Sequence, residues 1–223
     1  SMEKGAVIAE HDGRIITEIN EKTGLQNNLI LASASDFNGN TWLALSLGIS
    51  RIDPAKDITF WDKGNGLQGN IYDIIRFDKK IYLVTNQKIY SLQPSETKAS
   101  SGNYILSEVN SILPGQNWCL TNYKVPGKAG KEILLAGTQN GIFEINGNQG
   151  RQIYKGNLHA FQITQSEKFP DRIYSTDGFN DFISLVYKNG IWTLEGKWNG
   201  INDDIREIVE DKQGNLWLET FTN

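Results

Sequence analysis

A unit of about 40 residues recurs along this chain and limits what it can fold into. Each unit has an apolar strand, a turn, a second strand centred on a large side chain, and then Thr-x-x-Gly-Ile-aromatic or a variant of it. The central side chains of the second strands are 40, 52, 40 and 43 residues apart, at Trp42, Tyr82, Leu134, Tyr174 and Trp217. A four-stranded antiparallel blade of a β-propeller needs roughly 40 to 50 residues. The spacing therefore predicts an all-β propeller with about five blade units.

The local pattern also favours strands throughout. The chain consists mainly of short runs in which apolar and polar residues alternate or in which β-branched and aromatic residues are frequent. Turns that contain Gly, Asn, Asp or Lys separate these runs. Residues 203–211 are the one segment whose apolar spacing suits a helix. This segment stands where the first strand of the repeat stands in residues 29–36, so we predict a strand there.

The whole chain, residues 1–223, is predicted to be one propeller domain or a fragment of one. The expected blade units are residues 24–64, 66–108, 117–154, 157–195, and 199–223 together with 5–19. The fifth unit has two strands of four, and two predicted strands, 5–13 and 14–19, precede the first unit. We expect either a closed ring whose last blade combines both ends of the chain, or a piece cut from a longer array. Closure is favoured because an open array exposes two apolar faces.

The repeated Asp-x-x-Gly-Asn turns read as structural elements. Asp36 and Asp211 are expected to accept hydrogen bonds from the backbone of their own turns, and Gly39 supplies the positive φ of a tight hairpin. Asp36, Asn38 and Asn40 alternate as calcium ligands do. However, Gly and Glu do not stand where a calcium-binding EF-hand loop needs them, so we predict no metal site.

The tryptophans divide into two groups. Trp42 and Trp217 occupy the aromatic position of the second strand, where a large flat ring fills the space between adjacent blades, so both are predicted to be core residues. Trp198 lies in a polar connection and is the tryptophan we expect to be exposed. An exposed indole can stack on a sugar or on a partner side chain, although single exposed apolar residues are common.

Propeller topology predicts one face rich in polar loops. Loops between the second and third strands of a blade emerge on the same face as the blade-to-blade connections, and the other hairpins emerge on the opposite face. Amides that converge there suit a neutral polar ligand, and simple solvation of the loops is the alternative. The candidate ligand-binding residues are Asn27, Asn70, Asn86, Gln139, Asn140, Asp177, Trp198, Asn202 and Asp203, with Gln26, Gln68 and Ser46 on the same face.

The sequence predicts no catalytic residue and no cofactor. His11 and His159 have no partner at zinc-ligand spacing, and no nucleophile elbow, phosphate loop or dinucleotide fingerprint occurs. The neighbours Asp203 and Asp204 point to opposite faces of a strand, so they cannot flank one glycosidic bond. With a net charge of −4, the chain has no basic stripe that could bind nucleic acid. It also has no run of 18 apolar residues, so the sequence predicts no membrane span.

Residues 24–53 and 200–220 carry a recognisable pattern: Gly followed by Leu or Ile, polar residues, an apolar strand, and then Asp-x-x-Gly-Asn-x-Trp. In this they resemble the two-component regulator propeller repeat. The first unit has Leu45 and Ser46 where the family prefers Gly-Thr, and the second unit lacks Gly-Asn-x-Trp. The third and fourth units match mainly through Gly137–Phe143 and Thr176.

The resemblance implies a periplasmic or extracellular sensing region of a bacterial hybrid sensor histidine kinase. It implies a carbohydrate or other small polar ligand, no enzymatic activity, and the remaining domains of the receptor as partners. A homodimer is a further arrangement that the sequence leaves open. The alternatives are a protein-interaction scaffold and, less favoured, a propeller glycosidase or lyase.

Overall fold

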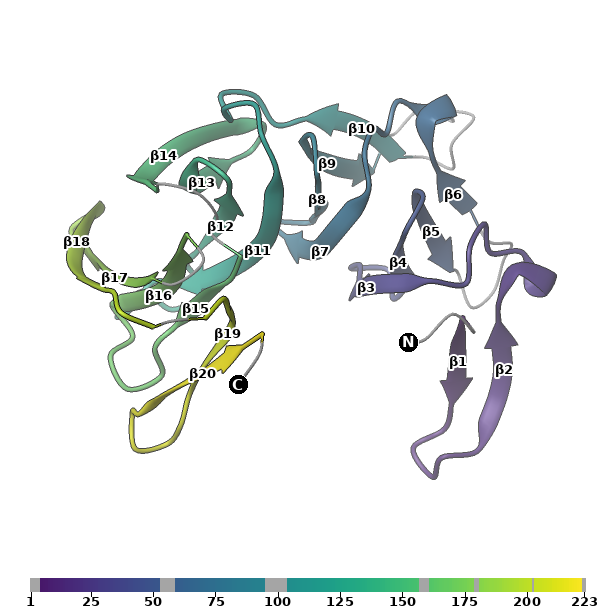
Figure 1. The fold of residues 1–223 in the computed structure, drawn as a ribbon. Helices are drawn as coiled ribbons and strands as arrows, with labels where there is room; N and C mark the ends of the chain where they lie inside the picture. Colours follow the sequence, from purple (N-terminus) through teal and green to yellow (C-terminus); the bar gives the residue numbers. More distant parts are fainter. Residues whose placement is uncertain are drawn as a thin grey trace. The chain divides into compact units, whose positions relative to one another are not determined.

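The structure is a computed structural model that describes residues 5–52, 59–94, 104–156, 161–178, 181–201 and 203–221. Within these ranges the chain is all-β, with four four-stranded antiparallel sheets, two two-stranded sheets and two short 3₁₀ turns (Figure 1). The predicted all-β fold with four-stranded antiparallel blades is confirmed. His159 and Asn202, both considered in the sequence, lie outside the described residues.

The chain divides into two compact units, and the first spans Ser1–Glu108. It begins with a hairpin of β1 (Ala6–Ala9) and β2 (Ile15–Ile19), followed by the turn η1 (Glu21–Thr23). Blade 1 consists of β3 (Ile30–Ser35), β4 (Thr41–Leu45), β5 (Ile49–Ile52) and β6 (Thr59–Trp61). The turn η2 (Lys63–Asn65) leads to blade 2, which consists of β7 (Ile71–Phe77), β8 (Lys80–Thr85), β9 (Ile89–Pro94) and β10 (Tyr104–Glu108).

The second unit spans Val109–Asn223. Blade 3 consists of β11 (Asn117–Lys124), β12 (Glu132–Thr138), β13 (Gly141–Asn146) and β14 (Gln149–Lys155). Blade 4 consists of β15 (Ile163–Gln165), β16 (Arg172–Asp177), β17 (Asp181–Lys188) and β18 (Ile191–Trp198). A two-stranded sheet of β19 (Ile205–Glu210) and β20 (Leu216–Thr220) follows, and we call it the half-blade.

The repeat correctly locates the second strand of the four blades and of the half-blade. Its five central side chains lie on β4, β8, β12, β16 and β20, and each of these strands pairs antiparallel with the strand before it. Residues 203–211 form the strand β19 rather than a helix, as predicted. That both ends of the chain complete one last blade, or that the chain is cut from a longer array, stays a prediction.

The core of the first unit lies between blades 1 and 2. Trp42 is fully buried, and its ring centroid is 4.9 Å from that of Trp61 and 4.9 Å from that of Tyr104, which begins the outermost strand of blade 2. Aliphatic side chains of β7 and β8, including Ile74 and Leu83, complete the cluster. Blades 1 and 2 therefore cover apolar side chains of each other's facing sides.

The Asp-x-x-Gly-Asn-x-Trp turn holds Trp42 in place. The backbone amides of Asn38 and Asn40 donate to Asp36 Oδ1, while Asn40 Nδ2, Trp42 Nε1 and Tyr104 OH donate to Asp36 Oδ2 at 2.8, 2.9 and 2.9 Å. Burial alone raises the pKa of Asp36, but these hydrogen bonds outweigh burial and the pKa lies below its usual value. The motif is thus a turn brace that also reaches the neighbouring blade.

The same turn forms in the half-blade, where Lys168 Nζ donates to the carbonyl oxygen of Gln213, but the indole of Trp217 stays exposed. Asn215 Nδ2 and Trp217 Nε1 donate to Asp211 Oδ2 at 2.9 and 3.0 Å, and these bonds lower the pKa of Asp211 to about 2. Trp217 is nevertheless 66% exposed, so the prediction that it is a core residue is wrong. Trp198 is 44% exposed, so the prediction that it is exposed is confirmed, although Trp217 is more exposed. The motif fixes the indole locally, whereas its burial depends on a neighbouring blade.

Candidate functional site

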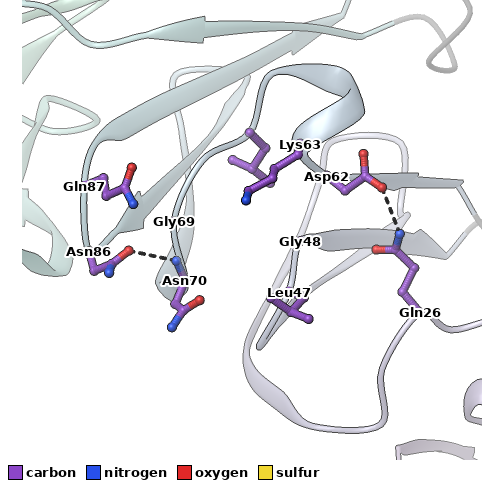
Figure 2. A pocket seen from close by; sticks show the side chains of 10 residues that line it. Gln26, Leu47, Gly48, Asp62, Lys63, Gly69, Asn70, Asn86 and Gln87 are labelled. Carbon is purple, nitrogen blue, oxygen red and sulfur yellow. Dashed lines mark hydrogen bonds between the residues drawn. The ribbon is translucent and has the colours of Figure 1, made fainter.

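The candidate site is a cleft of about 540 Å³ in the first unit, where loops of blades 1 and 2 face each other (Figure 2). The β4–β5 loop, the η2 connection and the β8–β9 loop supply most of its lining. The residues that line it are Gln26, Leu47, Gly48, Asp62, Lys63, Leu67, Gly69, Asn70, Asn86 and Gln87. These loops are of the two kinds that the topology predicts to share one face.

The connection from blade 1 to blade 2 is ordered by a capped 3₁₀ turn. Asp62 is the N-cap of η2, and its Oδ1 accepts a hydrogen bond of 2.7 Å from the backbone amide of Gly64. Its Oδ2 accepts a bond of 3.2 Å from Gln26 Nε2 (Figure 2). The turn closes at Gly66, whose φ of +90° suits glycine. Both carboxylate oxygens of Asp62 therefore already accept hydrogen bonds from residues of the cleft wall.

The chain uses the same device before blade 1. Asn20 is the N-cap of η1, and Gly24 closes that turn in the left-handed conformation. The sequence shows the parallel as Gly-Leu-Gln at 24–26 and again at 66–68, in each case after a capped turn. Asp62 and Lys63 were missed as cleft residues, although the repeated Gly-Leu-Gln could have located this connection.

On the blade 2 side, Asn86 ties its loop to the connection. Its backbone amide donates to the carbonyl oxygen of Asn70 at 3.0 Å, and its Oδ1 accepts from the backbone amide of Asn70 at 2.8 Å (Figure 2). Gly69 makes this approach feasible: an added Cβ there lies 2.4 Å from Asn86 Oδ1 and 2.9 Å from Thr85 Oγ1. Asn86 and Asn70 are the two candidate residues that the structure brings together in one cleft.

Replacing Gly69 with alanine is expected to push the Asn86 side chain out of position. The free energy of unfolding is expected to fall by about 2 kcal/mol, because alanine is strained in the left-handed backbone conformation and its Cβ clashes with Asn86. The matched control is Gly66→Ala. Its φ is +90° against +88° at Gly69, but no atom lies within 4 Å of its added Cβ, so it reports backbone strain alone. Chemical denaturation of both variants measures the difference. Equal losses would show that the close approach to Asn86 is unimportant.

The cleft offers hydrogen-bond donors beside apolar side chains. Asn86 Oδ1 and both oxygens of Asp62 are already bonded, whereas the described structure gives no partner to Asn86 Nδ2 or to Lys63 Nζ. Leu47 and Leu67 add apolar surface, and Asp62 is the one carboxylate among the described lining residues. Such a surface binds hydroxyl or carbonyl oxygens by hydrogen bonds and covers the apolar side of a ligand.

Asn27, a further candidate in the first unit, does not line the cleft. Its Oδ1 accepts a hydrogen bond of 2.7 Å from the backbone amide of Leu29, which braces the start of blade 1. In the second unit Gln139 and Asn140 tie the β12–β13 loop to the connection before β11. Gln139 Oε1 accepts from the backbone amide of Gln116 at 3.1 Å, and Asn140 Nδ2 donates to the carbonyl oxygen of Pro114 at 3.0 Å.

Asp177 is held in a network that joins blades 3 and 4. Its side chain is 2% exposed, and its Oδ2 accepts from Tyr154 OH at 2.9 Å and from Lys197 Nζ at 2.7 Å. Lys197 also pairs with Asp181 at 3.0 Å. Burial, and then the bond to Asp177, raise the pKa of Tyr154 to about 12, and the bond to Asp177 raises the pKa of Lys197. The contacts of Asp177 indicate a structural role.

The last two described candidates lie near the half-blade. The Trp198 ring stacks on Phe182 at 4.8 Å between centroids, with 12° between the planes. Asp203 Oδ1 accepts from the backbone amide of Asp204 at 2.8 Å. Among the described residues no group of three or more His, Cys, Asp or Glu side chains could hold a metal ion. No helix in the same part of the chain has the length and apolarity to cross a membrane.

No family model matches the chain, and no curated protein matches it. Solved structures do. The extracellular domain of the putative hybrid two component system BT4673 from B. thetaiotaomicron aligns with a TM-score of 0.65 and 17% identity, over 98% of this chain and 29% of that one. The β-propeller domain of Cps50 (Swd1) from Myceliophteria thermophila aligns with a TM-score of 0.65 and 13% identity, over 97% and 73%.

Propeller-like enzymes are also similar to the chain. Virginiamycin B lyase from Staphylococcus aureus aligns with a TM-score of 0.57 and 16% identity, over 85% of this chain and 62% of that one. At these identities the likeness shows the propeller fold alone. The chain spans less than a third of the BT4673 domain, so the activity of such a whole protein does not transfer to it.

Proposed function

We propose that this chain is a non-enzymatic, ligand-sensing propeller module of the extracytoplasmic part of a bacterial two-component receptor. Its ligand is a carbohydrate or another small polar molecule, bound in the cleft of the first unit. The observation that carries the proposal is the cleft itself, whose lining combines amide and ammonium donors with the apolar side chains of Leu47 and Leu67. The resemblance of the repeats and the similarity to an extracellular domain of a two-component system support the receptor assignment.

The cleft is built to couple ligand binding to blade packing. Leu47 belongs to the β4–β5 loop of blade 1, and Asn86 belongs to the β8–β9 loop of blade 2. A ligand that contacts both loops is sensitive to the separation of the two blades, whose main contact is the buried cluster around Trp42. Ligand binding therefore favours the arrangement of blades 1 and 2 that fits the ligand. A receptor can pass this shift between arrangements on to its other domains.

The residues of the cleft favour binding over catalysis. The described residues of the lining include no His, Cys or Ser, and Asp62, the one carboxylate among them, already accepts two hydrogen bonds. A general acid and base pair, which glycoside hydrolysis requires, is missing from this lining. Turnover of a glycan by the purified chain would contradict the non-enzymatic assignment.

Isothermal titration calorimetry against a panel of neutral and acidic oligosaccharides tests the proposal. At least one member is expected to bind, and Asn86→Ala is expected to weaken binding about tenfold or more, because it removes a donor of the cleft and loosens the connection. Gln139→Ala is the control, since Gln139 is an amide in the equivalent loop of blade 3 and does not line this cleft. If no sugar gives a heat of binding, or if both variants lose affinity equally, the cleft is not a carbohydrate site.

A further inference from the structure

Two charged side chains, Asp62 and Lys63, are among the described residues that line the cleft of the first unit. Asp62 accepts a hydrogen bond on each oxygen, from the amide of Gly64 at 2.7 Å and from Gln26 Nε2 at 3.2 Å. The ammonium of Lys63 has no hydrogen-bond or ion-pair partner among the described residues. Of the charges in this lining, the one that remains available to a ligand is therefore positive.

The backbone of η2 directs Lys63 into the cleft. Lys63 follows the N-cap Asp62, and its carbonyl oxygen accepts a hydrogen bond of 3.1 Å from the amide of Gly66, which closes the turn. Figure 2 shows the two side chains pointing apart, Asp62 toward Gln26 and Lys63 toward the loop of Asn86. The carboxylate thus belongs to the wall of the cleft, whereas the ammonium reaches the space that the cleft encloses.

The turn itself does not need a cation at this position. The turn η1 is capped in the same way by Asn20, and there the residue that follows the cap is Glu21. Capping geometry therefore accepts either sign of charge. A negative charge is also the sign that the N-terminal end of a helical turn favours. The local fold does not account for the positive charge of Lys63.

Neutral hydrogen-bond donors line the side of the cleft that Lys63 faces. Asn86 Oδ1 is bonded to the amide of Asn70, which leaves the Nδ2 group of Asn86 as the donor for a ligand. An anionic group only accepts hydrogen bonds, so it can take one from the ammonium and another from an amide group at once. Bonds of this kind that involve a charge are about twice as strong as neutral ones.

On the basis of the proposed function, we infer that the cleft selects acidic saccharides, and that Lys63 binds their carboxylate or sulfate group with Asn86 as the second donor. The apolar face of the sugar ring lies against Leu47 and Leu67. Because the whole chain carries a net charge of −4, the preference for an anion comes from contact with Lys63 and not from the overall charge.

Isothermal titration calorimetry with matched pairs of sugars tests this specificity. Oligogalacturonate and oligoglucuronate are each compared with their methyl esters, and a sulfated galactan fragment is compared with its unsulfated parent. At least one acidic sugar is expected to bind about tenfold or more tightly than its neutral counterpart. Its affinity is expected to fall as sodium chloride is raised, because salt screens the charge pair. The uronate and sulfate pairs show which anion the cleft takes.

Lys63→Met is expected to remove the preference for the acidic sugar, and Lys63→Arg, which keeps a cation, is expected to retain it. Since Lys63 is exposed and its side chain makes no described hydrogen bond or ion pair, the methionine variant keeps the fold. Lys22→Met is the control, because Lys22 is an exposed lysine of η1 that does not line the cleft. It changes the net charge equally and is expected to leave the preference in place.

Two results separate this inference from the proposed function. If acidic and neutral sugars bind equally, or if Lys22→Met weakens binding of the acidic sugar as much as Lys63→Met does, Lys63 does not select the ligand, although the cleft remains a sugar site. If none of the sugars binds, the proposed function is wrong, and the specificity inferred for Lys63 is wrong with it.

Discussion

Replacing Trp42 with alanine is expected to lower the free energy of unfolding by about 3–5 kcal/mol, the range for truncating a fully buried large aromatic side chain. The loss has two sources. A cavity opens between Trp61 and Tyr104, and Asp36 loses the indole hydrogen bond of 2.9 Å. Denaturant unfolding followed by circular dichroism measures the change.

Phe37→Ala is the matched control, because Phe37 is an aromatic residue of the same β3–β4 turn but is 62% exposed. Its ring contacts the Arg76 guanidinium at 4.8 Å, a contact worth about 1 kcal/mol or less at an exposed site. If Trp42→Ala lowers the free energy of unfolding no more than Phe37→Ala does, the cluster between blades 1 and 2 does not stabilise the first unit.

Replacing Asp177 with alanine is expected to cost about 2–4 kcal/mol in the free energy of unfolding. The change leaves the Lys197 ammonium and the Tyr154 hydroxyl without the buried carboxylate that both contact, and removing one partner of a buried pair is costly. Asp181→Ala removes the second carboxylate of the same lysine, but that carboxylate is 27% exposed and bonds at 3.0 Å. A loss below about 1 kcal/mol is expected there.

The same network predicts a loss of stability at alkaline pH. The folded-state pKa of Tyr154 is about 12 against 10.0 in the free side chain, so above pH 10 the unfolded chain loses this proton first and becomes favoured. The pKa of Lys197 is also raised, so its contribution is complete below its ordinary value of 10.5 and is lost as the pH rises through the folded value. Stability measured from pH 9 to 12 should therefore fall less steeply in Asp177→Ala than in the unmodified chain. Parallel curves would contradict this role.

The positions of β4 and β20 were predictable from sequence because the turn motif before each strand encodes its own geometry, whereas β8, β12 and β16 were located by the spacing of the repeat. Asp36 and Asp211 each accept bonds from the backbone and from the following Asn and Trp side chains, so the same local structure forms twice. Burial was not predictable in this way. Trp42 and Trp217 share the motif, yet one is fully buried and the other 66% exposed, because cover comes from the neighbouring sheet.

The candidate site was predictable only as a face. Strand order places the loops of Asn70 and Asn86 together, but it does not say which amides remain available to a ligand. Gln139 Oε1 and Asn140 Nδ2 bond to the connection before β11, as Asn86 Oδ1 bonds to Asn70, because the backbone groups of loops must find hydrogen-bond partners. Lys63 was missed because its position depends on the cap of η2, a local feature that strand patterns do not reveal.

The most direct test of the sensing proposal follows the side-chain amides of the chain by two-dimensional NMR as a saccharide that binds is added. We expect the signals of Asn70, Asn86 and Gln87 to shift together along one binding curve, while those of Gln139 and Asn140, which do not line the cleft, stay in place. Shifts centred on Gln139 and Asn140, with Asn86 unmoved, would place the ligand elsewhere and refute the sensing proposal.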